Sequence, residues 1–212
     1  MVRRFDIITE ADARNIELGA TVELAKGGHV TPLAADTLRE RRVTVVPAGS
    51  VDPAIPADLV PRSNVQRVAI ISDHTGIAMR AGIVKHLRGR GLAVDDMGVE
   101  STAAVDYPDT AARVATAVAR GEADAGIVID GAGIGSAIAA NKVRGVRAAM
   151  ITDDTIARYA REHNGTNVMT LGSTLLQLDV AIRLVDIWLG TPMTEPRYIR
   201  RLIKVRRLEE NF

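Results

Sequence analysis

The chain has 212 residues, of which 47% are apolar and 25% are charged, and its formal net charge is +1. This composition is that of a soluble globular protein, and the balanced charge gives no reason to expect a nucleic acid or a membrane surface as partner. The sequence contains no cysteine, which excludes disulfides, thiolate metal ligands and a cysteine nucleophile. Its four histidines (His29, His74, His86 and His163) lack metal-ligand spacing, so we expect a cytoplasmic protein without a bound metal.

Residues 1–50 form an amino-terminal extension. Short strands are expected around Gly27 and Gly28, and a helix is expected at about residues 32 to 41, which gives a small α+β unit. About 50 residues are marginal for independent stability, so the extension should pack on something else. Residues 51–64 contain three prolines and end in polar residues, which predicts a linker to the rest of the chain.

Residues 65–212 alternate between predicted strands and helices. Apolar runs predict strands at residues 67–72, 92–98, 125–130, 146–152 and 167–172. Helical patterns predict helices at residues 74–91, 106–122, 135–143, 153–164, 175–190 and 194–210. This alternation indicates an α/β fold, a three-layer α/β/α sandwich in which helices cover both faces of a five-stranded parallel sheet.

A ligand is expected at the carboxyl ends of these strands, because the loops there lead into helix amino termini. The first strand is followed by Asp73 and His74, and the third ends in Asp130 before a glycine-rich turn, residues 131–136. The glycines of that turn allow N–H groups to approach an anion closely. The turn is neither a dinucleotide fingerprint nor a P-loop, because it follows the third strand and lacks a Lys-Ser/Thr pair. A tight connection without a ligand is the other interpretation.

Three further features allow two interpretations each. Asp73 is either a site residue or the N-cap of the next helix, where aspartate is favoured. His163 and Asn164 either cap the end of a helix or belong to a site. Arg197 and Arg201 lie one helical turn apart, so they form either a solvated surface pair or two guanidinium groups that hold a phosphate.

Taken together, five segments resemble the ribose-5-phosphate isomerase B/galactose-6-phosphate isomerase family. They are SDHTG (72–76), DYPD (106–109), GIVIDGAGIGSAIAANKVRGVRAA (126–149), REHNGTNVMTLGS (161–173) and PRYIRRL (196–202). The resemblance implies a Rossmann-like fold, a homodimer or a dimer of such dimers, and sites built from two subunits. It also implies aldose–ketose isomerisation of a sugar phosphate through an enediolate, without a metal or organic cofactor.

The resemblance also assigns the proton transfer. The family's usual base is a cysteine in a C-G-T-G-I-G turn, and Asp130 stands at that position here, while Ser136 replaces the glutamate that some members use six residues later. Asp130 is therefore the expected base, by analogy with carboxylate bases in other isomerases. A helix amino terminus stabilises the charged acid, however, which makes it a weaker base. The residues of the turn are expected to bind the substrate, with the N–H groups of the first five stabilising the enediolate: Gly131, Ala132, Gly133, Ile134, Gly135 and Ser136.

The remaining roles come from the same resemblance. His163 is expected to open the sugar ring as an acid, and Asn164 to bind sugar hydroxyls or the enediolate. Asp73, which we count with the catalytic residues, and Tyr107 should face the sugar. The phosphate is assigned to three cationic side chains: His74, Arg197 and Arg201.

Two departures from the family pattern leave the substrate open. Ala132 stands where the family has a threonine, and Thr174 stands where it has a third arginine. We expect an aldose–ketose isomerase of a sugar phosphate with four to six carbons, similar to ribose 5-phosphate. Two alternatives stay open: an isomerase of a different or unphosphorylated sugar, and a non-catalytic protein that binds sugar phosphates or serves assembly.

The extension resembles the leading segment of the ethanolamine-utilization cobalamin adenosyltransferase. The shared features are ITEA (8–11), ATVEL (20–24) and HVTPLAADTLRERRV (29–43). Such segments occur among proteins associated with bacterial microcompartments. The resemblance implies docking of residues 1–50 to a microcompartment partner or shell, and hence a location in the cytoplasm or at such a compartment. An extension that only buttresses the dimer is the alternative.

Overall fold

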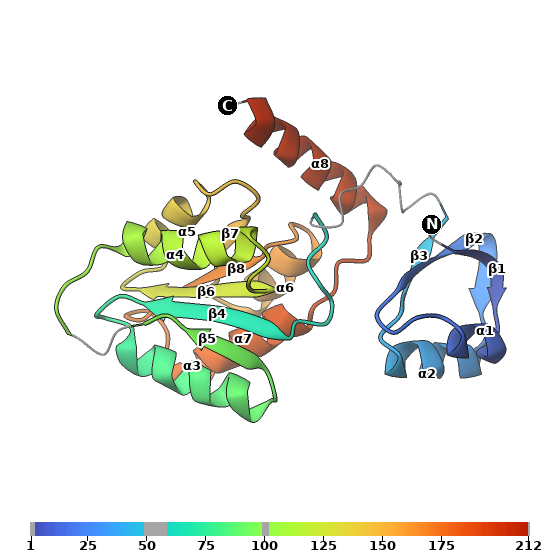
Figure 1. Ribbon diagram of the computed structural model, residues 1–212, viewed down its shortest axis with the longest axis horizontal. Coiled ribbons are helices and arrows are strands. Elements are labelled where there is room, and N and C mark those ends of the chain that lie inside the picture. Colours follow the sequence, from blue (N-terminus) through green and yellow to red (C-terminus); the bar gives the residue numbers. More distant parts are fainter. Residues whose placement is uncertain (1–2, 49–58, 99–101, 212) are drawn as a thin grey trace.

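The computed structural model describes residues 3–48, 59–98 and 102–211 of the chain, and these fold into two units. The smaller unit comes first, and Figure 1 shows it set to one side of the larger sandwich. Of the predicted linker, residues 51–58 lie outside the described residues. Its last part is described, and Leu59 there is buried.

The smaller unit is a three-stranded parallel sheet with two helices. Its elements are β1 (Arg4–Ile8), α1 (Glu10–Arg14), β2 (Thr21–Val30), α2 (Pro32–Glu40) and β3 (Thr44–Pro47), and the strand order is β1-β2-β3. Threonines cap both helices: Thr9 forms a capping box with Asp12, and Thr31 precedes a proline in the first turn. The sequence places this unit in the α+β class, whereas its strands are all parallel and alternate with its helices.

The larger unit contains the predicted five-stranded parallel sheet. Its strands are β4 (Arg67–Ser72), β5 (Ala93–Asp96), β6 (Ala125–Asp130), β7 (Ala148–Met150) and β8 (Val168–Gly172). The strand order is β5-β4-β6-β8-β7, and every neighbouring pair is parallel. The helices are α3 (Ile77–Gly89), α4 (Tyr107–Ala119), α5 (Ile134–Ala140), α6 (Asp154–Glu162), α7 (Leu178–Gly190) and α8 (Pro196–Asn211). The predicted fold class is therefore confirmed for this unit.

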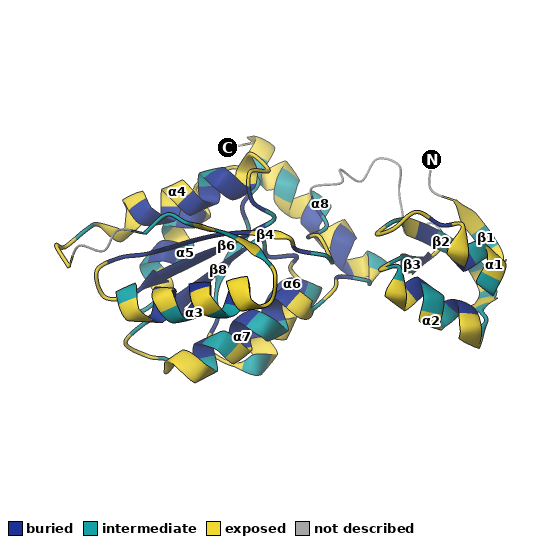
Figure 2. Ribbon diagram, turned by 60° about the horizontal axis from the view of Figure 1, so that its bottom comes forward, coloured by how far each residue is buried: buried dark blue, intermediate teal, exposed yellow. Residues whose placement is uncertain are grey.

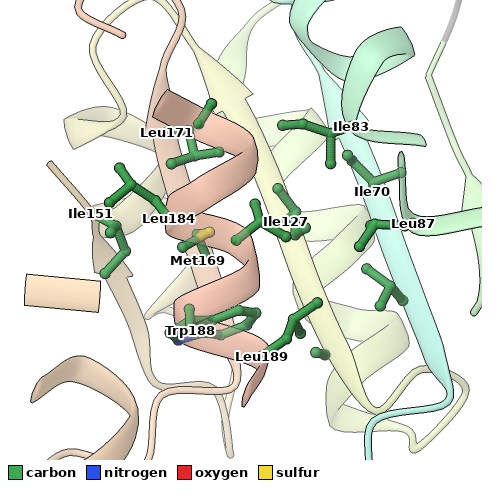
Figure 3. Close-up of a cluster of buried hydrophobic side chains, with 14 of the residues drawn as sticks. Ile70, Ile83, Leu87, Ile127, Ile151, Met169, Leu171, Leu184, Trp188 and Leu189 are labelled. Carbon is green, nitrogen blue, oxygen red and sulfur yellow. The ribbon is translucent and has the colours of Figure 1, made fainter. Parts of the chain in front are cut away.

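Helices cover both faces of the larger sheet because alternate strand residues point to opposite sides. On one face, Ile70 and Ile127 pack with Leu184 and Trp188 of α7, together with residues of α3 and α6 (Figure 3). On the other face, Ile71 and other strand residues pack with α4 and α5. Figure 2 shows the central strands as buried and the helices as exposed on their outer sides. Burial of these two apolar layers is the main force that holds the sandwich together.

The connections of this sheet create a crevice at its carboxyl edge. From β4 the chain crosses to β5 on one side, and it then crosses back to β6 on the other side of β4. Such a reversal of strand order separates the two loops, so a ligand can enter between the carboxyl ends of β4 and β6. Asp73 and Asp130 lie at these two strand ends.

The last helix, α8, lies at the opposite, amino edge of the sheet. Tyr198, Ile199 and Leu202 of α8 are buried together with Leu59 and Met193. Further along, Glu209 accepts a hydrogen bond from the Gly145 N–H at 2.8 Å, in the loop that leads into β7. Among the described residues, no helix is long and apolar enough to cross a membrane.

Candidate active site

Asp73 directly follows β4, and its side chain forms an Asx turn. Its Oδ1 accepts hydrogen bonds from the Thr75 N–H at 2.8 Å and from the Thr75 hydroxyl at 2.6 Å. Helix α3 starts four residues after Asp73, with Gly76 as its N-cap and no side-chain cap. The alternative reading of Asp73 as the N-cap is therefore wrong. Among the described residues, the second carboxylate oxygen of Asp73 has no hydrogen-bond partner, and the side chain is 8% exposed.

The carboxylate of Asp130 lies inside the glycine-rich turn. Its Oδ1 accepts hydrogen bonds from the N–H groups of Ala132, at 2.8 Å, and Gly133. Its Oδ2 accepts from the Ser136 N–H at 3.0 Å and from the Ser136 hydroxyl. A carboxylate offers about four acceptor positions, so these four donors hold the side chain in one orientation. The anion that occupies this turn is thus a side chain of the protein itself.

The backbone of the turn requires glycine at two positions. Gly133 has a φ of 82°, in the left-handed region that other residues adopt at a cost, and it is the N-cap of α5. A Cβ at Gly135 would lie 2.7 Å from the ring of Tyr107, so only glycine allows α4 and α5 to approach this closely. The N–H groups of Ile134 and Gly135 have no acceptor among the described residues. They are free to bind a substrate oxygen.

Residues after β8 connect the two strand ends to each other. The Ser173 N–H donates to the Asp130 carbonyl at 2.8 Å, and the hydroxyls of Ser173 and Thr75 lie 2.8 Å apart. Thr174 donates twice to the Gly131 carbonyl, from its N–H at 3.1 Å and from its hydroxyl at 2.6 Å. Thr174, at the position of the family arginine, thus braces the turn.

The other four predicted site residues lie away from this turn, at the amino edge of the sheet: His163, Asn164, Arg197 and Arg201. His163 is the C-cap of α6, and its N–H donates to the Tyr159 carbonyl at 2.9 Å. Its ring lies between those of Tyr159 and Tyr198, with centroids 4.3 Å away on each side. Arg197 and Arg201 place their guanidinium carbons 4.8 and 5.6 Å from the Tyr198 ring centroid. Asn164 is exposed.

These two groups lie at opposite edges of the same sheet. A helix that follows a strand in a parallel sheet starts at the carboxyl edge and ends at the amino edge, where the next strand begins. Asp73, His74, Tyr107 and residues 130–136 all lie at the carboxyl edge, whereas His163 follows the end of α6. The chain therefore brings together the carboxylates, the turn and Tyr107, but it does not bring them to His163 and the two arginines.

Asp153, at the end of the fourth predicted strand, has a structural role. It is the N-cap of α6, and its carboxylate accepts hydrogen bonds at 2.9 Å from the N–H groups of Thr155 and Ile156. The bond from Ile156 is the main cause that lowers the pKa of Asp153 below its usual value. No group of three or more residues able to ligate a metal occurs in the described part of the chain.

Sequence reasoning missed four residues of these two locations: Thr75, Ser173, Tyr159 and Tyr198. Tyr159 stands four residues before His163, and this spacing alone places the two rings on one face of a helix. Tyr198 lies between the two predicted arginines in the sequence. Its contact with His163 depends on how α8 packs, which the sequence pattern does not indicate.

Comparisons with known proteins identify the family of this chain. The family model described as Ribose/Galactose Isomerase matches residues 68–205. Ribose-5-phosphate isomerase B of Escherichia coli strain K12 is 41% identical over 145 residues, which cover 68% of this chain and 97% of that protein. The chain therefore belongs to the ribose/galactose isomerase family, as the sequence motifs predict.

Solved structures show the same fold. Ribose-5-phosphate isomerase B from Clostridium thermocellum superimposes with a TM-score of 0.67 at 43% identity, covering 68% of this chain and 98% of that one. The enzyme from Mycoplasma genitalium, solved with bound ribulose-5-phosphate, gives a TM-score of 0.66 at 37% identity, covering 69% of this chain and 97% of that one. Residues 1–67 precede the part that the family model matches.

Proposed function

We propose that the protein is an aldose–ketose isomerase of a sugar phosphate that uses Asp130 as the base. The observation that carries this proposal is the buried carboxylate of Asp130, held in the glycine-rich turn of a ribose/galactose isomerase, at the reversal of strand order. The proposed substrate is ribose 5-phosphate or a similar sugar phosphate of four to six carbons. Relatives with the name ribose-5-phosphate isomerase B support this choice.

In the proposed reaction, Asp130 moves one proton between two neighbouring carbons. The carboxylate takes the proton from C2 of the open-chain aldose, and the electron pair of that C–H bond forms the enediolate double bond. Returning the proton to C1 gives the ketose, while the hydroxyl proton moves from O2 to O1. The free N–H groups of Ile134 and Gly135 are donors for the enediolate oxygen.

The hydrogen bonds of Asp130 decide how it can accept a proton. All four of its acceptor positions are occupied, three of them by backbone N–H groups that cannot turn away. The Ser136 hydroxyl is the one donor that can rotate, and its rotation opens a lone pair on Oδ2. Asp73, whose second oxygen has no hydrogen-bond partner within residues 3–48, 59–98 and 102–211, is the neighbouring carboxylate that would face the sugar hydroxyls.

The complete site requires two copies of the chain. His163, Asn164, Arg197 and Arg201 lie at the amino edge of the sheet, so they cannot reach the Asp130 of their own chain. In the proposed homodimer, the amino edge of one subunit faces the carboxyl edge of its partner. His163 then opens the sugar ring as an acid, and the two arginines hold the phosphate together with His74.

A panel of aldose and ketose phosphates, each compared with the free sugar, tests the proposed function. We expect turnover of at least one phosphorylated sugar, with the free sugar at equal concentration converted at least about tenfold more slowly because it lacks the phosphate contacts. Faster conversion of the free sugars would contradict the proposed phosphate specificity and favour an isomerase of unphosphorylated sugars. Binding of a sugar phosphate without any turnover would favour a non-catalytic binding protein.

The amino-terminal extension is proposed to dock the enzyme to a partner, with a microcompartment shell as the candidate. Its resemblance to segments of ethanolamine-utilization proteins and its separate three-stranded sheet support this proposal. Deletion of residues 1–58 leaves the part that aligns with the complete relatives, so turnover should persist. Co-purification with neighbouring pathway proteins should be lost, and unchanged co-purification would contradict docking.

A further inference from the structure

The ring of His163 is held between two tyrosines that the proposed reaction does not use. Tyr159 stacks on one face at 4.3 Å with an interplanar angle of 21°, and Tyr198 lies on the other at 4.3 Å with an angle of 30°. The His163 side chain is 27% exposed, and Glu162 Oε1 lies 3.8 Å from its Nε2. The imidazole has no hydrogen bond within the described part of the chain, so the two rings set its orientation.

Tyr198 also contacts the two arginines of α8. Arg197 donates a hydrogen bond from Nη2 to the Tyr198 hydroxyl at 3.0 Å, and its guanidinium carbon lies 4.8 Å from the ring centroid. The guanidinium carbon of Arg201 lies 5.6 Å from the same centroid. Both distances fall within the range of cation–π attraction, which is about 6 Å. One aromatic ring therefore touches the histidine and both arginines.

The two tyrosines differ in how firmly they are held. Tyr198 is 6% exposed and packs in an apolar cluster with Leu59, Met193 and Leu202. Tyr159 is 47% exposed, and its ring stacks on that of His163. Tyr198 is thus anchored to the body of the protein, whereas Tyr159 covers the histidine from the solvent side.

We propose that Tyr198 is a positioning residue that couples anion binding at Arg197 and Arg201 to the orientation of the His163 ring. An anion that draws the guanidinium groups into hydrogen bonds changes their contact with Tyr198, and the stacked imidazole responds because it shares that ring. The identity of the anion as a sugar phosphate, and the role of His163 as an acid, rest on the proposed function. The coupling itself needs neither.

Aromatic NMR of the full-length protein, titrated with inorganic phosphate, tests the coupling without turnover. The chain has four histidines, so the Cε1–H signal of His163 is assigned by its loss in His163→Gln. In the wild type we expect phosphate to shift this signal. In Tyr198→Leu we expect the shift to be lost, because the connecting ring is gone. Absence of a shift in the wild type, or an equal shift in Tyr198→Leu, would overturn the proposal.

Two milder variants separate coupling from a general loss of structure. Tyr198→Phe keeps the stack but loses the bond to Arg197, so the phosphate shift should persist with a half-saturating concentration about threefold higher. Tyr159→Leu is the matched control, because it removes the other half of the stack and leaves the arginines alone. It should move the His163 signal without changing the half-saturating phosphate concentration. Identical phosphate titrations for Tyr198→Phe and the wild type would contradict the role of the hydroxyl.

Steady-state kinetics add a second test, because a purely structural role would not separate a change in KM from a change in kcat. We expect Tyr198→Phe to raise KM for a sugar phosphate about threefold with little change in kcat, and Tyr198→Leu to lower kcat as well. Equal losses of kcat in both variants would contradict the proposal. Turnover absent in the wild type, with an intact phosphate response, would remove the proposed function and leave the coupling. Normal turnover without a phosphate response would do the reverse.

Discussion

The two ends of strand β6 carry two aspartates with different surroundings: Asp130 is buried, and Asp124 is partly buried. Asp124, just before the strand, accepts hydrogen bonds at 2.9 Å from the N–H groups of Gln66 and Arg67 and pairs with the guanidinium groups of Arg62 and Arg67, both at 3.2 Å. Asp130, at the end of the strand, has no ion pair among the described residues and is held by neutral donors alone. Asp124 therefore ties the start of β6 to the start of β4, whereas Asp130 is held by the turn that follows its own strand.

The electrostatics of Asp124 agree with a structural role. Burial alone would raise the pKa of Asp124, but the hydrogen bonds from Gln66 and Arg67 and the charge of Arg62 outweigh it and lower the pKa below its usual value. A carboxylate neutralised by two guanidinium groups is a poor base. Four sets of variants test the proposed difference between the two ends of β6 and the roles of the other site residues.

Asp130→Asn should have the largest effect, a fall in kcat of about 10³-fold, because it removes the proposed general base. The amide keeps one acceptor oxygen, but its NH2 group replaces Oδ2 and cannot accept the Ser136 N–H. This unsatisfied donor costs on the order of 1–2 kcal/mol of stability. Steady-state kinetics and thermal unfolding separate the two effects.

Asp130→Cys restores the family residue and should recover part of the turnover. It should also make the enzyme sensitive to iodoacetamide, to which the cysteine-free wild type is indifferent. Near-normal turnover in Asp130→Asn would move the role of base to Asp73.

His163→Gln should lower kcat about 10²-fold on a sugar phosphate that forms a ring. An aldotetrose 4-phosphate cannot close a five-membered ring, because its O4 carries the phosphate, and so it needs no ring opening. If the wild type accepts this sugar, the variant should convert it at nearly the wild-type rate. Equal losses on cyclic and acyclic substrates would contradict the role of His163 as the ring-opening acid.

Arg197→Gln and Arg201→Gln should each raise KM for a phosphorylated sugar about tenfold, because each variant loses one charge-assisted hydrogen bond to the phosphate. The rate at saturation should change little, and conversion of the corresponding free sugar should not respond. Steady-state kinetics with both sugars make this comparison. Variants that lose kcat alone would show that the arginines act on the reacting carbons.

Asp124→Asn is the matched control for Asp130→Asn, because it makes the same chemical change at the other end of β6. We expect unchanged turnover and a loss of about 2 kcal/mol in the free energy of unfolding at pH 7. The folded-state pKa of Asp124 is lowered, so its contribution is present above the unfolded pKa, about 3.9, and disappears as the pH falls through the folded value. Chemical unfolding across pH 2 to 7 should therefore show the two proteins converging in acid.

Much of the fold could be predicted from the sequence. The apolar run of β6 ends at the predicted residue, and the strand–helix alternation correctly predicts five parallel strands. The family prediction is confirmed by the match over residues 68–205. The same alternation could also have placed His163 at the edge opposite Asp130, since a helix returns the chain to the amino edge before the next strand.

The details of the candidate site could not be predicted in the same way. The bonds from the turn to Asp130 depend on the left-handed conformation of Gly133 and on the placement of Ser136 six residues later. The stack on His163 depends on Tyr198, which α8 brings back from another part of the chain. Patterns of spacing indicate which residues share a face, but they do not indicate which side chains of distant elements meet. The roles of the site residues stay predictions.

The central claim, that Asp130 moves a carbon-bound proton, is tested most directly by proton NMR in D₂O. Wild type and Asp130→Asn are incubated with ribose 5-phosphate and the other sugars of the panel. We predict that the wild type removes the C2 proton signal of one aldose phosphate while its ketose isomer appears, and that Asp130→Asn does neither while remaining folded. Proton exchange at the wild-type rate in Asp130→Asn would contradict the claim.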